Sequence, residues 1–224
     1  MKQLLLHLRT VGTPDIYRGG ESIFFQSEVP QFAVIVLNGV VKAYTISPEG
    51  DKTIVQFYGK GSILPGDWVN SQSSTALYNI DAVNDVRVLK VKRSDFQAAI
   101  ESNPEFQREY LNYMLQAQAA MMLRITGLCQ SRASYKICYT LYFLLFRYGV
   151  ARDDDTYLID LKLTQGMIAE LIGQTRESTA KNLKALKLAG IVDYNSSSYS
   201  VDKRKLESYL GEDGFRDLGI ARLR

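Results

Sequence analysis

The sequence predicts an α+β protein with an antiparallel β jelly-roll barrel, then one long helix, then a winged helix-turn-helix module. Short β-rich runs recur between turn residues from about residue 16 to residue 91. From Pro104 the chain has neither proline nor glycine until Gly127, which is typical of a long helix. Two short helical patterns meet at Gly173, with a strand-like run on either side. The predicted divisions are residues 1–103, 104–132 and 133–224.

Composition excludes several classes of site. The chain has 224 residues, a net charge of +3, two cysteines and one histidine. Catalytic zinc sites and cupin-type metal barrels use two or three histidines, so His7 alone argues against a metalloenzyme on the barrel. Cys129 and Cys138 have no neighbours with metal-ligand spacing, and so few cysteines indicate a reducing compartment. We therefore expect no enzyme activity and no metal.

The start of the chain does not resemble a signal peptide. In "MKQLLLHLRTVG" the residues His7 and Arg9 interrupt the apolar run, so a short amphipathic helix is the better interpretation. The longest later apolar run, residues 137–146, is half a membrane span. We expect a soluble, cytoplasmic protein with no membrane partner.

Two turns stand out in the predicted barrel. Asn38-Gly39 lies between two β-rich runs and predicts a two-residue hairpin. "SPEGD", residues 47–51, predicts a second turn.

After the barrel the hydrophobic period becomes helical. Ser94 is the expected N-cap of a short helix through Ile100, and Pro104 lies in the first turn of a helix that runs to about Arg132. An apolar stripe at alternating spacings of three and four follows that helix: Leu111, Met114, Gln118, Met121, Ile125 and Leu128. Such a stripe fits either a dimer seam or packing on the barrel, and periodicity alone slightly favours packing.

A buried helix, residues 133–148, precedes the C-terminal module. In that module Thr164 is the expected N-cap of the first helix, Gly173 the turn, and Thr175 the cap of a second helix that ends at about Ala189. The run "YLIDLKL" before them and "GIVDYNSSSYSVD" after them read as strands, so a β-hairpin wing follows the helix pair.

The charges of the second helix favour DNA as the partner. Arg176, Glu177 and Lys181 lie in its first turn and a half, the part that enters the major groove in such modules. Arginine can pair with guanine, glutamate with cytosine, and lysine with guanine or phosphate. The expected phosphate contacts are Thr164, Thr175, Ser178 and Lys184, together with the wing around Ser196 to Tyr199. Exposed helices often carry lysines, so a protein–protein adaptor is the alternative.

At these residues the chain resembles the cyclic-AMP receptor protein and FNR superfamily of bacterial transcription regulators. "RESTAK", residues 176–181, resembles the Arg-Glu-Thr-Val-Ser-Arg pattern of that family's recognition helix, and "LTQGMIAELIG" resembles its first DNA helix. "VLNGVVKAY", "SPEGDK" and "GKGSI" resemble its cyclic-nucleotide-binding-like barrel, more loosely.

The resemblance implies a homodimer joined along the long helix, with the stripe from Leu111 to Leu128 as the seam. It also implies double-stranded DNA as a partner and RNA polymerase as a further candidate. Lys181 stands where the family has a second base-reading arginine. Thr179 and Asn182 replace apolar residues, so Leu183, Leu186 and Leu188 are the remaining packing candidates.

The expected sensor region departs further from the family. Cyclic-nucleotide binders hold the phosphate with an arginine, whereas residues 61–86 contain no Arg or Lys but three acids, Asp67, Asp81 and Asp85. We therefore expect no cyclic-AMP binding of the family's usual kind. The family's haem sensor uses a mid-chain histidine and its iron–sulfur cluster four cysteines, so neither cofactor is expected.

An uncharged effector is the remaining candidate ligand. Its pocket residues would be Trp68, Asn70, Gln72, Tyr78 and Asn79, which fit equally well as ordinary barrel and loop residues. Two interpretations follow: an effector-gated regulator, or a constitutive DNA-binding regulator with a structural barrel. The tail, residues 211–224, carries no motif.

Overall fold

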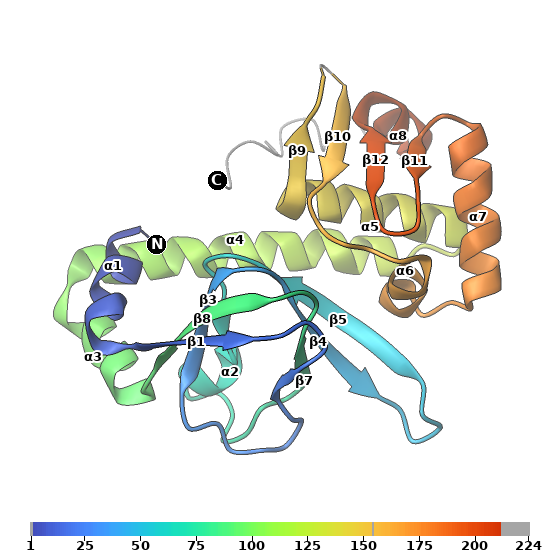
Figure 1. Cartoon of the computed structure of the whole chain (residues 1–224). Helices are drawn as coiled ribbons and strands as arrows, with labels where there is room; N and C mark the ends of the chain where they lie inside the picture. Colours follow the sequence, from blue (N-terminus) through green and yellow to red (C-terminus); the bar gives the residue numbers. More distant parts are fainter. Residues whose placement is uncertain (1, 154, 212–224) are drawn as a thin grey trace. The chain divides into compact units, whose positions relative to one another are not determined.

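A computed structural model describes residues 2–153 and 155–211 (Figure 1). Contacts divide the chain into two compact units, with the boundary between Gln116 and Ala117. This boundary falls inside the long helix α4 (Pro104–Leu128), so α4 contributes residues to both units. Most of the tail noted above, residues 212–224, lies outside the described part of the chain.

The first unit is a sandwich of two antiparallel sheets, which confirms the predicted β domain. One sheet has the strand order β1-β8-β3-β6 and the other β2-β7-β4-β5. The strands are β1 (Thr13–Tyr17), β2 (Ser22–Phe24), β3 (Ala33–Asn38), β4 (Val41–Ile46), β5 (Lys52–Tyr58), β6 (Ile63–Leu64), β7 (Asn79–Ala82) and β8 (Val86–Val91).

Strand β3 explains how the unit forms two layers of core. Successive side chains of a strand point to opposite faces. Val34 and Val36 pack between the two sheets, whereas Ala33 and Ile35 pack on the other face of their sheet. Both faces of β3 are therefore buried, and its sequence reads as a continuous apolar run rather than an alternating one.

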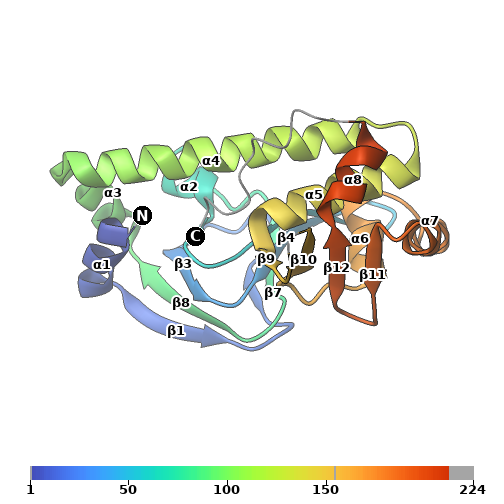
Figure 2. The same cartoon turned by 90° about the horizontal axis from the view of Figure 1, so that it is seen from above.

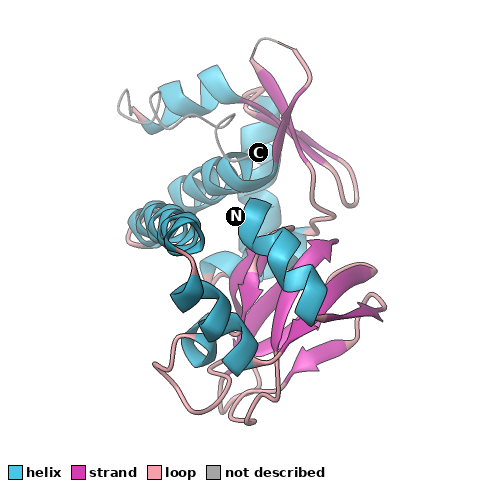
Figure 3. Cartoon of the chain, turned by 90° about the vertical axis from the view of Figure 1, so that its left-hand side faces the viewer, coloured by secondary structure: helices cyan, strands magenta, loops and turns pink. Residues whose placement is uncertain are grey.

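Helices cover that second face (Figures 2 and 3). They are α1 (Lys2–Val11), α2 (Gly66–Val69), α3 (Arg93–Ser102) and the beginning of α4. Glu109 of α4 accepts hydrogen bonds from the backbone N–H groups of Gln3 (3.3 Å) and Leu4 (2.9 Å), at the start of α1. The expected N-cap at Ser94 is wrong, because α3 already begins at Arg93 and its cap position is Lys92.

The hairpin predicted at Asn38-Gly39 is also wrong. β3 pairs with β6 and β8, whereas β4 pairs with β5 and β7, so this turn carries the chain from one sheet to the other. Gly39 has φ +90°, and a Cβ there would lie 2.6 Å from the carbonyl oxygen of Asp85. The second predicted turn does join paired strands, because β4 and β5 form a hairpin around residues 47–51.

Helix α4 has two distinct faces. Phe106, Tyr110 and Tyr113 pack against the helical layer of the first unit. The predicted stripe lies on another face: Leu111, Met114, Gln118 and Ile125 are exposed, and Met121 and Leu128 are half-buried. Packing of the stripe on the barrel, which periodicity slightly favoured, is therefore wrong.

The long helix ends at Leu128, four residues before the expected Arg132. Its last turn tightens, because the N–H of Gln130 donates to the carbonyl of Gly127. Gly127 packs closely on the next helix, since a Cβ at this position would lie 2.6 Å from the Cβ of Tyr139.

The second unit is built around α5 (Ala133–Tyr148), whose residues 137–146 are all buried, as predicted. Around it lie α6 (Gln165–Ile172), α7 (Arg176–Leu188), α8 (Lys203–Leu210) and a sheet of order β11-β12-β10-β9. The strands are β9 (Gly149–Ala151), β10 (Thr156–Ile159), β11 (Val192–Tyr194) and β12 (Tyr199–Asp202). Strand β9 and helix α8 were not predicted. Of the described helices, none is both long and apolar enough to span a membrane.

Replacing Gly39 with alanine should destabilise the first unit more than the same change at Gly50. Both glycines have φ near +90°, where an L-residue pays about 1–2 kcal/mol of strain. A Cβ at Gly50 meets nothing within 4 Å, whereas at Gly39 it meets backbone. Urea denaturation of the two variants measures the difference, and equal losses would show that the contact with Asp85 is easily relieved.

Candidate nucleic-acid interface

Helices α6 and α7 form the predicted helix-turn-helix. The Oγ1 of Thr164 accepts the N–H of Met167 (3.2 Å) and caps α6. Gly173 follows in the left-handed conformation (φ 62°), where glycine has no steric penalty. The Oγ1 of Thr175 accepts the N–H of Ser178 (3.2 Å) and caps α7. Both caps and the turn residue confirm the prediction.

Helix α7 buries a narrow face. Thr179, Leu183 and Leu186 are buried, at spacings of four and three. Leu188, expected to pack, is 82% exposed, because it lies two residues beyond Leu186 and so on the far side of the helix. The hydroxyl of Thr179 has no hydrogen-bond partner, whereas Asn182 donates to the carbonyl of Ser178 (2.8 Å).

The wing is tied to the end of α7 by Lys187. Its Nζ lies 2.6 Å from Oδ1 of Asp193 and donates to the carbonyl of Tyr194 (3.3 Å). The hydrogen bond from Lys187 to the Asp193 carboxylate, together with the lysine charge, lowers the pKa of Asp193. At the wing tip, Oδ1 of Asn195 accepts the N–H groups of Ser197 (3.1 Å) and Ser198 (2.9 Å). The tip therefore has a defined turn beside α7.

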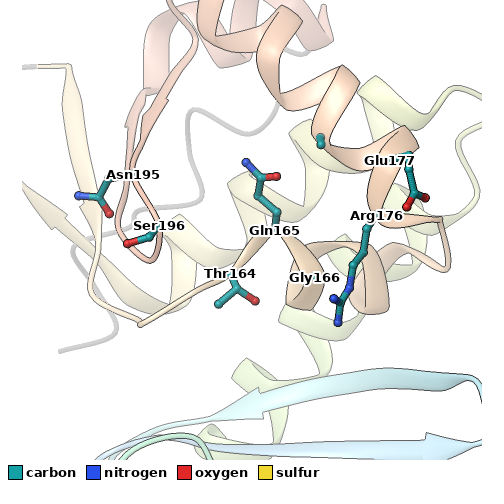
Figure 4. Close-up of a pocket in the computed structure, with 8 residues that line it drawn as sticks. Thr164, Gln165, Gly166, Arg176, Glu177, Asn195 and Ser196 are labelled. Atoms are coloured by element: carbon teal, nitrogen blue, oxygen red, sulfur yellow. The ribbon is translucent and has the colours of Figure 1, made fainter.

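An open cleft of about 620 Å³ lies between the beginnings of α6 and α7 and the wing tip. Its lining residues are Thr164, Gln165, Gly166, Arg176, Glu177, Ala180, Asn195 and Ser196. Figure 4 shows the Arg176 side chain reaching down beside Gly166, while Gln165 points up between α7 and the wing. The cleft thus brings together residues from three separate elements.

The cleft includes four of the predicted site residues: Thr164, Arg176, Glu177 and Ser196. Sequence reasoning missed Gln165, Gly166, Ala180 and Asn195. Sequence position could have identified three of them. Gln165 and Gly166 directly follow the predicted contact Thr164, and Ala180 lies one helical turn after the predicted contact Arg176, so it shares a helix face with it.

The other predicted contacts lie on α7 outside the cleft lining. Thr175 and Ser178 share the cap hydrogen bond, and Lys181 and Lys184 are exposed. Within residues 2–153 and 155–211, no identified ion pair involves Arg176, Lys181 or Lys184. These three cations are therefore available to an anionic partner.

Helix α4 contacts the helix-turn-helix through Arg124. This buried side chain donates from Nη2 to the carbonyl of Leu171 (3.1 Å), near the C-terminal end of α6. Burial lowers the pKa of Arg124 to about 10, so the guanidinium remains charged at neutral pH. A cation at this end of α6 is favoured by the helix dipole.

The exposed face of α4 is wider than the predicted seam. Leu115 and Met122, which the sequence analysis did not name, are 53% and 59% exposed beside Leu111 and Ile125. Together these residues form an apolar surface along successive turns of one helix.

The structure does not gather the candidate effector residues into one set. Trp68 packs in the helical layer, and Asn70 accepts the hydroxyl proton of Tyr110 (2.9 Å). Tyr78 packs against the core between the sheets, Gln72 is exposed, and Asn79 accepts the N–H of Gln26 (3.1 Å). The searched part of the chain also contains no group of three potential metal ligands.

Two family models match the chain. Residues 15–103 match a cyclic nucleotide-binding domain, and residues 136–209 match a Crp-like helix-turn-helix domain. The second match contains the complete cleft.

Similar curated proteins are bacterial regulators. The nitrogen fixation regulation protein FixK of Azorhizobium caulinodans is 25% identical over 190 residues, which cover 84% of this chain and 74% of FixK. The transcriptional activator protein FnrL of Cereibacter sphaeroides is 22% identical over 203 residues, covering 88% and 80%.

Solved structures share the fold. FixK2 from Bradyrhizobium japonicum superimposes with a TM-score of 0.70 at 22% identity, covering 88% of this chain and 96% of FixK2. A cyclic nucleotide-binding domain containing protein from Listeria monocytogenes gives a TM-score of 0.78 at 16% identity, covering 91% and 98%.

Proposed function

The chain belongs to the CRP/FNR superfamily of transcription regulators, and on this premise we propose that it is a homodimer that reads a two-fold symmetric DNA site. The cleft carries the proposal. It presents Arg176 and Glu177, at the start of α7, opposite a wing tip on the same open side. A recognition helix docks with its first residues at the base edges. Arg176 and Glu177 are the first two residues of α7.

We assign base reading to Arg176, Glu177 and Lys181. Arg176 can donate two hydrogen bonds to O6 and N7 of one guanine, and Glu177 can accept one from N4 of a cytosine. Lys181 has a single ammonium group and cannot make the bidentate contact, so it discriminates less. Each half-site should therefore contain G·C pairs under the start of α7.

The backbone contacts should come from the periphery of the cleft. Thr164 caps α6 at the edge of the cleft, and Thr175 and Ser178 lie at the start of α7. Lys184, one turn after Ala180, adds an exposed cation. Such contacts set the orientation of the protein on the duplex but carry no sequence information.

The dimer seam should be the exposed apolar face of α4. Leu111, Leu115, Met122 and Ile125 recur at spacings of four, seven and three, so they follow one side of the helix. Two copies of this face can bury each other in a coiled-coil seam. A two-fold dimer then presents its recognition helices to half-sites about 34 Å apart.

The effector of the first unit should not be cyclic AMP bound in the family's usual way. Of the three acids in residues 61–86, Asp81 accepts the hydroxyl proton of Ser22 (2.8 Å), and Asp85 pairs with Arg18 (3.0 Å). Two arginines from outside this segment reach it, and both are engaged there: Arg18 pairs with Asp85, and Arg93 donates to Oγ of Ser71 (2.5 Å). An uncharged effector remains the leading candidate, and a constitutive regulator with a structural barrel is the second.

Replacing Arg176 with alanine should cost about 1–3 kcal/mol of binding to the preferred site and relax the preference at one base pair. The preferred site is obtained by selection from random duplexes, and affinities are measured by fluorescence anisotropy. Lys184→Ala is the control, because loss of a phosphate contact weakens binding to all sequences alike and lowers the salt slope.

Two other outcomes would reassign the site. An equal loss on every duplex would make Arg176 a backbone contact. Binding to duplexes that is weak and insensitive to salt would favour the adaptor function instead.

A Leu115→Glu, Met122→Glu double variant should be monomeric and should lose most of its affinity for the full site. Two glutamates in an apolar seam would be buried next to their copies, where like charges repel. Asn112→Glu, Gln116→Glu is the control, because these exposed residues each follow a seam residue by one position and so lie about 100° around α4 from it. Sedimentation velocity measures the oligomeric state. A Leu115→Glu, Met122→Glu variant that remains dimeric would contradict the proposed seam.

Cyclic AMP should change neither the melting temperature nor the DNA affinity. A ligand that binds only the folded state stabilises it in proportion to the logarithm of its concentration, so binding is visible in a thermal shift. A concentration-dependent rise that also tightens DNA binding would contradict this expectation. The same assay with uncharged metabolites separates an effector-gated regulator from a constitutive one.

A further inference from the structure

Gly166 is a glycine that its own backbone does not require. It is the second residue of α6, and it is not among the glycines with positive φ. In a helix, glycine is less favourable than alanine by roughly 0.5–1 kcal/mol, because it loses more conformational freedom on folding. The reason for a glycine at this position must therefore lie outside the helix.

The neighbour that occupies the space over Gly166 is Arg176. A Cβ at Gly166 would lie 3.1 Å from Nε, 3.3 Å from Cζ and 3.4 Å from Nη2 of Arg176, and these three atoms are its nearest contacts. The guanidinium group therefore lies against the bare Cα of Gly166, between the beginnings of α6 and α7 (Figure 4). Both residues line the cleft.

We propose that Gly166 is a specificity-determining residue that positions Arg176 for base reading. This inference rests on the proposed function. Without a side chain at Gly166, the guanidinium can lie low in the cleft, on the side that faces DNA. A methyl group at this position would lie 3.1 Å from Nε, so the guanidinium has to shift by a few tenths of an ångström.

Small displacements matter for this contact. A bidentate pair needs two N–H groups aligned with O6 and N7 of one guanine, so a shift of the guanidinium weakens both bonds together. No ion pair or hydrogen bond identified within the described ranges engages the Arg176 guanidinium. Its position therefore depends on packing, and Gly166 supplies the packing surface.

The test is a double-mutant cycle of Gly166→Ala and Arg176→Ala. Affinities are measured for the selected site and for a duplex in which the pair read by Arg176 is changed. We expect Gly166→Ala to weaken binding to the selected site about 5- to 30-fold, a range inside the roughly 5- to 150-fold loss expected for the whole arginine contact. Binding to the changed duplex should stay nearly constant, and the double variant should bind no more weakly than Arg176→Ala.

Stability provides the control for a structural effect. The melting temperature of Gly166→Ala should equal or exceed that of the wild type, because alanine is the better helix former. Gly66→Ala is the matched variant: Gly66 lies in the first turn of a helix, as Gly166 does, has no positive φ, and its Cβ would meet nothing within 4 Å. It should leave DNA selectivity unchanged.

The outcomes separate the two proposals. A wild-type protein that does not discriminate between duplexes overturns the proposed function itself. If the wild type discriminates through Arg176, but the two substitutions act independently, only the role of Gly166 is overturned. Tighter or unchanged binding of Gly166→Ala to the selected site also overturns it.

Discussion

The packing of α6 and α7 on α5 is the constraint from which the interface follows. Helix α5 is buried along residues 137–146, whereas α7 commits only Thr179, Leu183 and Leu186 to the core. A helix that buries so narrow a face leaves the rest of its surface to solvent. The Thr164 and Thr175 caps then set where the two helices begin, and those beginnings form the cleft.

Helix α4 serves both units because its faces have different chemistry. Phe106, Tyr110 and Tyr113 pack within the first unit, and buried Arg124 donates to the end of α6 in the second. The apolar face of Leu115 and Met122 stays exposed. A regulator of the proposed kind needs one element that can meet a second copy and also touch the DNA-reading helices. In this chain α4 touches α6 through Arg124, and its exposed apolar face is the surface that we propose for the second copy.

The charges of the first unit, rather than its fold, are the basis for proposing that cyclic AMP does not bind in the usual way. The first unit matches a cyclic nucleotide-binding domain, and its two-sheet sandwich is shared with solved relatives. A fold of this kind can bind many different ligands, so the side chains of the binding site decide which ligand is recognised. Residues 61–86 supply three acids, of which Asp81 accepts a hydrogen bond from Ser22 and Asp85 pairs with Arg18 within the unit.

The sequence by itself determined the features that depend on neighbours along the chain. The threonine caps, the Gly173 turn, the Pro104 start of α4 and the extent of α5 are local, since each depends on residues within one or two turns. The same local reasoning failed at Asn38-Gly39, because the choice between a hairpin and a crossing of sheets depends on β6, β7 and β8. It also misplaced Leu188. Only the tertiary structure decided which face of α4 stays exposed, and which side chain lies against Gly166. Both features depend on contacts between residues that are distant in sequence, and hydrophobic periodicity along the chain does not predict such contacts.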